Sequence, residues 1–185
     1  MGKKPSVTEK MNLPKPSDKD SAAISDFIYD YISGTPVRAT PEEIEAVQVF
    51  ARRLVDELGY PKEIITTRPQ FRVRARPSEP SAKGYPVDIV VFKNKKKLED
   101  EVYIVVECKR KTRTDGEKQL KMYLSLCSAQ LGVWFNGKDH LYLHKKLLAD
   151  GSIDWQVLPT LPRRDQDISD IGSLTRQELV PPPQI

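Results

Sequence analysis

Hydrophobic side chains recur at helical spacing in the stretch that begins at Thr40. Threonine at the N-cap, Pro41 in the first turn and two glutamates near the positive end of the helix dipole favour a helix start there. The apolar residues behind it fall on one face, and Gly59 is a typical stop. That stripe consists of Ile44, Val47, Ala51, Leu54, Val55 and Leu58. The pattern predicts a long amphipathic helix.

Two other stretches have the same spacing. The first, residues 115–130, predicts a second helix, whose apolar positions are Leu120, Tyr123, Leu124 and Cys127. The second, residues 21–32, predicts a shorter helix that Gly34 ends. Its apolar positions are Ile24, Phe27, Ile28 and Tyr31.

Shorter stretches have the character of strands. One alternates apolar with basic residues, three are almost entirely apolar, and the last two form a pair at the end of the domain. In chain order they are residues 70–75, 85–92, 101–107, 131–135, 140–144 and 153–158. The order helix, three strands, helix, strand and edge hairpin predicts an α/β domain with helices packed against a mixed sheet.

Proline placement divides the chain of 185 residues. It has 15 prolines, and none lies between Pro86 and Pro159. Because proline is excluded from helix interiors and central strands, this middle part is free to build regular structure. We expect a flexible head over residues 1–20, one folded domain over residues 21–158, and a proline-rich tail over residues 159–185. The tail is either a linker to another domain or an ordinary frayed terminus.

The composition excludes several classes of protein. Hydrophobic residues make up 38% and charged residues 30%, which argues against wholesale disorder, and no stretch approaches the roughly 20 apolar residues of a membrane helix. No apolar run follows the basic start, and two cysteines cannot form a disulfide framework, so the cytoplasm is the expected compartment. The net charge of +4 permits a nucleic-acid partner without demanding one.

Charged residues interrupt the two most apolar strands. Asp88 lies inside YPVDIVVF, and Glu107 and Lys109 close EVYIVVECK. A carboxylate in a buried strand is costly unless it is paired, protonated or bound to a metal. Since side chains alternate along a strand, Glu107 and Lys109 share a face about 6 to 7 Å apart. Cys108 points to the other face, where it can pack as a small hydrophobe.

This arrangement suits hydrolysis of a phosphodiester. If the two strands are neighbours, Asp88 and Glu107 converge within reach of one divalent ion, and oxygen ligands select magnesium or manganese. The backbone carbonyl of Cys108 is a further candidate ligand. A lysine beside the ion fits a role on the attacking water or on the charge that develops at phosphorus. A structural salt bridge at a strand end is the alternative explanation.

Three motifs follow one another in an order that resembles the PD-(D/E)XK nuclease superfamily. They are Asp88, then Glu107-Cys-Lys109, then Gln119-Leu-Lys-Met-Tyr123. More narrowly, the chain resembles the nuclease domain at the N-terminus of type I restriction enzyme R subunits, over about residues 40–144. Flanking phrases agree: Leu58-Gly-Tyr-Pro61, Pro86-Val-Asp-Ile-Val90, Val105-Val-Glu-Cys-Lys109 and Gly132-Val-Trp-Phe-Asn-Gly137. The resemblance implies a restriction-endonuclease-like mixed β-sheet flanked by helices.

The resemblance also implies roles for single residues. Asp88 and Glu107 would ligate Mg²⁺ or Mn²⁺, and Lys109 would assist the nucleophilic water. Gln119 and Tyr123 match the QxxxY element of this branch and share one helical face. They would position DNA or the active site, with an ordinary half-exposed helix surface as the alternative.

Many relatives take a further acid from the first core helix. On the helical wheel Glu43 falls nearest the apolar stripe, whereas Glu42 and Glu45 point away, so we expect Glu43 to be the additional metal ligand. The favourable interaction of a first-turn acid with the helix dipole explains Glu43 equally well.

Three basic clusters are expected near the proposed metal site and suit phosphate contacts, which position a duplex without reading it. A solvated surface is the ordinary meaning of such runs. The candidate nucleic-acid-binding residues are Arg72, Arg74, Lys95, Lys96, Arg110, Lys111 and Arg113. No recognition helix or zinc finger is present in the sequence, which places any sequence specificity in another domain or subunit.

The sequence therefore predicts a Mg²⁺-dependent DNA endonuclease domain of restriction-modification type. Its expected partners are DNA and a motor, methyltransferase or specificity domain or subunit, and no membrane is involved. The alternative is a non-catalytic DNA-binding or docking module that keeps the nuclease fold.

Overall fold

The structure is a computed structural model that describes residues 26–76, 78, 80 and 83–172. The first helix, residues 41–57, begins where predicted, because the Thr40 hydroxyl accepts a hydrogen bond of 3.1 Å from the Glu43 amide. It continues through η1 (Glu43–Val47), α1 (Gln48–Arg52) and η2 (Arg53–Glu57). Gly59, at a φ of 76°, follows its end.

The apolar stripe of this helix differs from the predicted one at its start. The π-helical turns of η1 and η2 close i→i+5 hydrogen bonds, which changes the angular spacing of side chains. Ile44 is consequently 45% exposed, whereas Ala46 and Phe50 are fully buried. The rest of the stripe faces the core.

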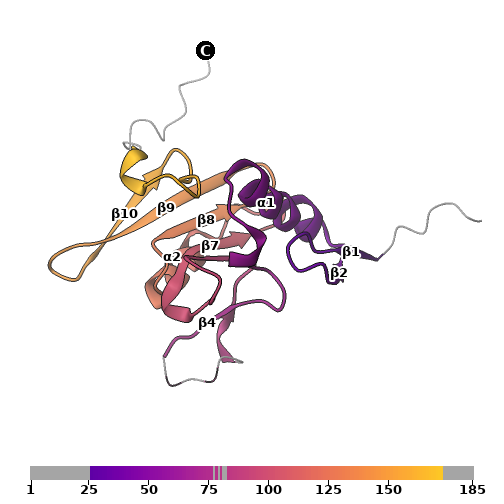
Figure 1. Cartoon of the computed structure of the whole chain (residues 1–185), viewed down its shortest axis with the longest axis horizontal. Coiled ribbons are helices and arrows are strands. Elements are labelled where there is room, and N and C mark those ends of the chain that lie inside the picture. Colours follow the sequence, from indigo (N-terminus) through magenta and orange to yellow (C-terminus); the bar gives the residue numbers. More distant parts are fainter. Residues whose placement is uncertain (1–25, 77, 79, 81–82, 173–185) are drawn as a thin grey trace, which may run out of the picture.

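Six strands form the central sheet in the order β10-β9-β8-β7-β6-β3 (Figure 1). Their bounds are β3 (Ile65–Thr66), β6 (Ile89–Phe92), β7 (Val102–Cys108), β8 (Leu131–Phe135), β9 (His140–Leu147) and β10 (Ile153–Leu158). β7 and β8 run parallel, connected by α2 (Glu117–Leu126), and the other neighbours are antiparallel. The mixed α/β sheet that the sequence predicts is confirmed.

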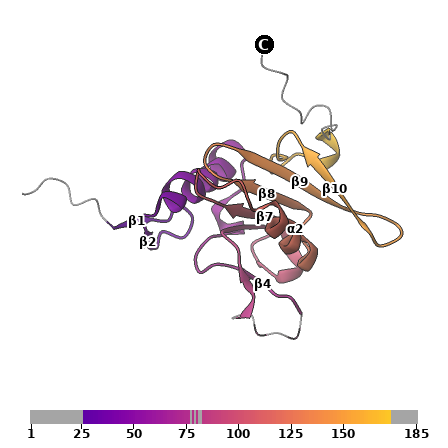
Figure 2. The ribbon, with the colours of Figure 1, turned by 180° about the vertical axis from the view of Figure 1, so that it is seen from behind.

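Helices cover both faces of this sheet (Figures 1 and 2). Alternate strand residues divide between two apolar clusters, as the strand period requires. Val91, Ile104 and Val106 pack with Phe50 of the first helix. On the opposite face, Val105 packs with Leu120 and Leu124 of α2, together with Trp134. Both faces of β7 are therefore buried, so a charged side chain at its end needs a partner.

The predicted helix over residues 21–32 is wrong where the structure describes it. β1 (Phe27–Tyr29) pairs instead with β2 (Pro36–Arg38) as an antiparallel ribbon, and residues 21–25 lie outside the described part. The turn between them is stabilised by Asp30, whose carboxylate accepts from the Ser33 amide at 2.7 Å. Such side-chain bonds to the backbone compete with a helix too short to be stable alone.

Two predicted strands are shorter than expected. β4 (Arg72–Val73) and β5 (Tyr85–Pro86) form a separate ribbon at one edge of the molecule, so residues 70–75 and 85–92 are divided between this ribbon and the sheet (Figure 1). The break in the second stretch falls at Asp88, directly before β6. Short 3-10 turns complete the fold: η3 (Lys62–Ile64), η5 (Glu99–Glu101) and η6 (Ile168–Asp170).

The described part of the segment after residue 158 packs on the domain. Leu161 is buried in the core, and the Tyr60 hydroxyl donates to the carbonyl of Pro162 at 2.9 Å. The head over residues 1–20 lies outside the described residues, and the domain boundaries stay a prediction. None of the helices within the described ranges is long and apolar enough to cross a membrane.

Replacing Thr40 by alanine is expected to lower the free energy of unfolding by about 1 kcal/mol, because an amide in the first helical turn loses its acceptor. Denaturant unfolding measures this, and Thr40→Ser, which keeps the hydroxyl, is the matched control. Equal losses in the two variants would contradict a capping role.

Candidate active site

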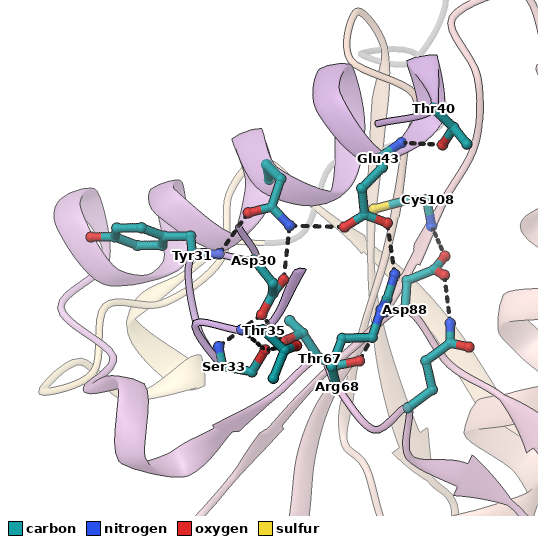
Figure 3. Close-up of polar contacts among 12 residues, drawn as sticks. Asp30, Tyr31, Ser33, Thr35, Thr40, Glu43, Thr67, Arg68, Asp88 and Cys108 are labelled. Atoms are coloured by element: carbon teal, nitrogen blue, oxygen red, sulfur yellow. Dashed lines mark hydrogen bonds and ion pairs between the residues drawn. The ribbon is translucent and has the colours of Figure 1, made fainter. Parts of the chain in front are cut away.

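Antiparallel pairing brings Asp88 beside the end of β7. Ile89 pairs with Val106, so Asp88, one residue earlier, lies level with Glu107. One carboxylate oxygen of Asp88 accepts from the Cys108 amide at 2.8 Å, and the other accepts from the Gln70 side chain at 3.2 Å (Figure 3). The neighbouring strands that the sequence analysis required are therefore present, and both oxygens of Asp88 are oriented.

Glu107 and Lys109 share one face of the strand, as alternation predicts. The Lys109 ammonium donates to a carboxylate oxygen of Glu107 and forms an ion pair with it. Glu107 is only 3% exposed. Cys108 points to the opposite face and is fully buried in the core.

Burial makes both carboxylates unusually basic. Burial, with a smaller contribution from the charge of Glu42, raises the pKa of Asp88 to about 6, although the Cys108 amide opposes the shift. Burial and then the charge of Asp88 raise the pKa of Glu107 to about 7, against the hydrogen bond from Lys109. Burial lowers the pKa of Lys109. The hydrogen bond to Glu107 and the charge of Glu107 act in the opposite direction, and the Lys109 pKa is raised. This is a pair of mutually repelling acids with one attached cation.

Gln119 and Tyr123 lie on α2, on the sheet face that carries Glu107. The Gln119 amide donates to the Tyr123 hydroxyl, which in turn donates to the carbonyl of Pro86 at 3.3 Å. Pro86 is two residues before Asp88, and burial, together with the charges of Glu107 and Asp88, raises the Tyr123 pKa. The predicted QxxxY pair is thus brought together and placed against the segment that leads into Asp88.

Glu43 lies in a different environment from these residues. It is 6% exposed, and its two oxygens accept from Gln48 at 2.8 Å and from Arg68 at 2.6 Å (Figure 3). Its neighbour Glu42 is the helix acid whose charge acts on both Asp88 and Glu107. Among the residues that the structure describes, no group of three or more His, Cys, Asp or Glu side chains is placed to hold a metal ion.

A family model described as "Type I restriction enzyme R protein N terminus" matches residues 41–162. The chain belongs to this family. The match spans the first helix, the whole sheet and α2, and therefore Asp88, Glu107, Lys109, Gln119, Tyr123 and Glu43. Neither a curated protein nor a solved structure matches the chain.

Membership of the type I restriction enzyme R N-terminal family implies a role in restriction-modification. It also suggests assembly with the other subunits of such a system and with DNA. The resemblance found from the sequence is confirmed at this level.

Two of the three basic clusters lie next to residues of the candidate site. Arg110, Lys111 and Arg113 directly follow Lys109, and Arg72 and Arg74 follow Gln70, which contacts Asp88. Arg72 donates to the Gly84 carbonyl, and Arg74 pairs with Glu99. Arg113 pairs with Asp115, and the Lys111 ammonium lies 3.8 Å from a carboxylate oxygen of Glu45.

The lysine turn corrects the expectation that all three clusters lie near the carboxylates. Lys95 and Lys96 are exposed in the turn that joins β6 to β7. Since Asp88 directly precedes β6 and Glu107 is the penultimate residue of β7, this turn lies at the opposite end of the strand pair. A contact between these lysines and DNA stays a prediction.

Two side chains at the site were not found from the sequence. Arg68 and Gln70 precede β4, and although Gln70 begins a predicted alternating strand, the pattern assigns neither side chain to the site. The hydrogen bond of Gln70 to Asp88 and the ion pair of Arg68 with Glu43 are contacts between segments distant in sequence. The pairing of β4 with β5 brings Gln70 to Asp88, and the first helix brings Glu43 to Arg68.

Proposed function

We propose that this chain is the Mg²⁺-dependent DNA endonuclease domain of a restriction-modification enzyme, with the catalytic constellation of the PD-(D/E)XK superfamily. The observation that carries the proposal is the placement of the half-buried Asp88 beside the buried Glu107, with Lys109 paired to Glu107. Family membership supports the same conclusion at a coarser level.

The donor set fits a hard divalent cation. Asp88 and Glu107 offer carboxylate oxygens, the ligands that Mg²⁺ and Mn²⁺ prefer, and the Cys108 carbonyl is a further candidate. The raised pKa values of Asp88 and Glu107 reflect burial and negative charge that Lys109 only partly offsets. A bound cation would relieve that repulsion, and magnesium usually retains several waters, so two protein carboxylates suffice.

Each residue then has a definable task in phosphodiester hydrolysis. Asp88 and Glu107 would hold the ion, which supplies Lewis-acid stabilisation and a more acidic water. Lys109 keeps its proton beside Glu107 and donates a hydrogen bond to the attacking water or to the oxygens of the phosphate as negative charge develops there. Gln119 and Tyr123 hold the segment that carries Asp88 in place through the Pro86 carbonyl.

Manganese titration by calorimetry tests the metal site. Wild-type protein is expected to bind Mn²⁺ near neutral pH, and Glu107→Ala is expected to lose that binding because half of the carboxylate pair is removed. Glu117→Ala is the matched control, since Glu117 is exposed on α2 and pairs only with Lys121. Equal binding by wild type and Glu107→Ala, in folded proteins, would overturn the proposed ligand set.

A non-catalytic DNA-binding or docking module is the second candidate. The ion pair of Lys109 with Glu107 favours it, because that pair partly neutralises the buried acid without any metal. DNA binding that is unchanged by both divalent cations and Asp88→Ala would favour the module over the nuclease.

A further inference from the structure

A buried polar network connects the β1–β2 turn, the first helix and the segment before β4 (Figure 3). The Gln48 side-chain amide donates to Asp30 and to Glu43, each at 2.8 Å, and the Thr67 hydroxyl also donates to Asp30. Asp30, Gln48, Glu43 and Thr67 are 1%, 7%, 6% and 0% exposed. These side chains are shielded from solvent, and each carboxylate accepts hydrogen bonds from other members of the network.

The network ends on one cation, Arg68. Its guanidinium donates to a Glu43 oxygen at 2.6 Å and to the Thr67 carbonyl at 2.8 Å, which uses two of its five N–H groups. The Arg68 side chain is nevertheless 23% exposed. The buried partners hold the guanidinium in one orientation, while its other N–H groups remain accessible to solvent. Such a guanidinium is pre-organised to bind a planar anionic group, because little rotamer entropy remains to be lost.

Arg68 lies on the Asp88 side of the candidate active site. Gln70, two residues further on, donates directly to Asp88, and Figure 3 shows the Arg68 side chain rising between Asp88 and the helix that carries Glu43. The positive charge of Arg68 acts on Asp88, as does that of Lys109. Two cations, Lys109 and Arg68, therefore act on Asp88, and Lys109 is also paired with Glu107.

The charge around the carboxylates favours a second fixed cation beside them. Before a metal ion binds, Asp88, Glu107 and the nearby Glu42 outnumber Lys109, so a further cation favours the approach of a phosphodiester. Lys109 is already engaged by Glu107. An arginine with unused N–H donors can bind a phosphate through two parallel hydrogen bonds.

We propose that Arg68 binds a phosphate of the DNA strand at the Asp88–Glu107 site, and that Glu43 positions Arg68 rather than ligating the metal ion. The inference rests on the proposed nuclease function for the identity of the ligand. It assigns different tasks to two adjacent glutamates, because both Glu43 oxygens are used within the network while the Glu42 charge reaches the metal-site acids.

The DNA arm of the test measures binding of a fluorescein-labelled 20-base-pair duplex by anisotropy, with Ca²⁺ present, at several salt concentrations. Arg68→Ala is expected to weaken binding about tenfold and to reduce the salt slope by about 0.9, the share of one phosphate contact. Arg68→Gln keeps a donor for Glu43 and replaces Arg68→Ala if that variant fails to fold. It is expected to show the same loss of affinity and the same reduction of the salt slope. Arg53→Ala is the matched control, because Arg53 pairs with Glu57 in the last turn of the first helix.

The metal arm titrates Mn²⁺ into Glu43→Gln and Glu42→Gln. Glu43→Gln is expected to bind Mn²⁺ like wild type and to weaken duplex binding, whereas Glu42→Gln is expected to weaken Mn²⁺ binding. An unchanged salt slope in both Arg68 variants, or a wild type that does not bind the duplex, overturns the phosphate contact. Loss of Mn²⁺ binding in Glu43→Gln overturns its positioning role. A failure of the nuclease proposal appears separately, as Mn²⁺ binding that Glu107→Ala does not affect.

Discussion

Replacing Lys109 by alanine is expected to slow DNA cleavage by about a hundredfold to a thousandfold, the usual loss when one pre-organised donor to transition-state charge is removed. The ammonium is held beside Glu107 and its pKa is raised, so it stays charged at neutral and mildly alkaline pH. The rate of plasmid nicking in Mg²⁺ measures the effect.

The Lys109 variant requires attention to pH. The hydrogen bond from Lys109 lowers the pKa of Glu107, so its removal raises that pKa further and weakens metal binding at neutral pH. Cleavage is therefore compared at several pH values up to about pH 8.5, so that protonation of Glu107 is separated from loss of the ammonium. Lys121→Ala is the matched control, since Lys121 pairs with Glu117 on α2. Cleavage by Lys109→Ala at the wild-type rate would remove Lys109 from the mechanism.

Metal binding is expected to weaken strongly as the pH falls. A cation binds the ionised carboxylates, and the pKa values of Glu107 and Asp88 are raised to about 7 and about 6. Protonation of Glu107 begins below about pH 8 and that of Asp88 about one unit lower, so Mn²⁺ affinity falls roughly a hundredfold to a thousandfold between about pH 8 and pH 5. Calorimetric titration across this range measures the change.

The metal-free protein is expected to show the opposite trend in stability. A carboxyl group whose pKa is raised on folding binds more protons in the folded than in the unfolded state. Asp88 and Glu107 therefore contribute stability that increases as the pH falls through their folded pKa values, and Asp88→Asn with Glu107→Gln should remove this part of the trend.

A Mn²⁺ affinity that is flat from pH 8 to pH 5 would contradict the two-carboxylate site.

Several elements were predictable because their signals are local. The Thr40 cap, the strand that ends in Glu107 and the Asn136-Gly137 turn depend on residues close together in the chain, and the structure has each of them. The helix predicted over residues 21–32 was wrong because a tertiary contact competes with the local pattern. Asp30 is drawn into the buried network by Gln48 and Thr67, and the backbone turns at that point.

The α/β class, the two buried strands and the three charged residues at their ends follow from local patterns, since periodicity and the cost of burying charge are properties of short stretches. Which side chains meet at the site depends on how distant segments pack. Asp88 reaches the Cys108 amide through strand pairing, and Glu43 is occupied by Gln48 and Arg68. These contacts join residues 5 to 25 positions apart, and side-chain direction in irregular or π-helical segments follows from packing rather than from a repeat.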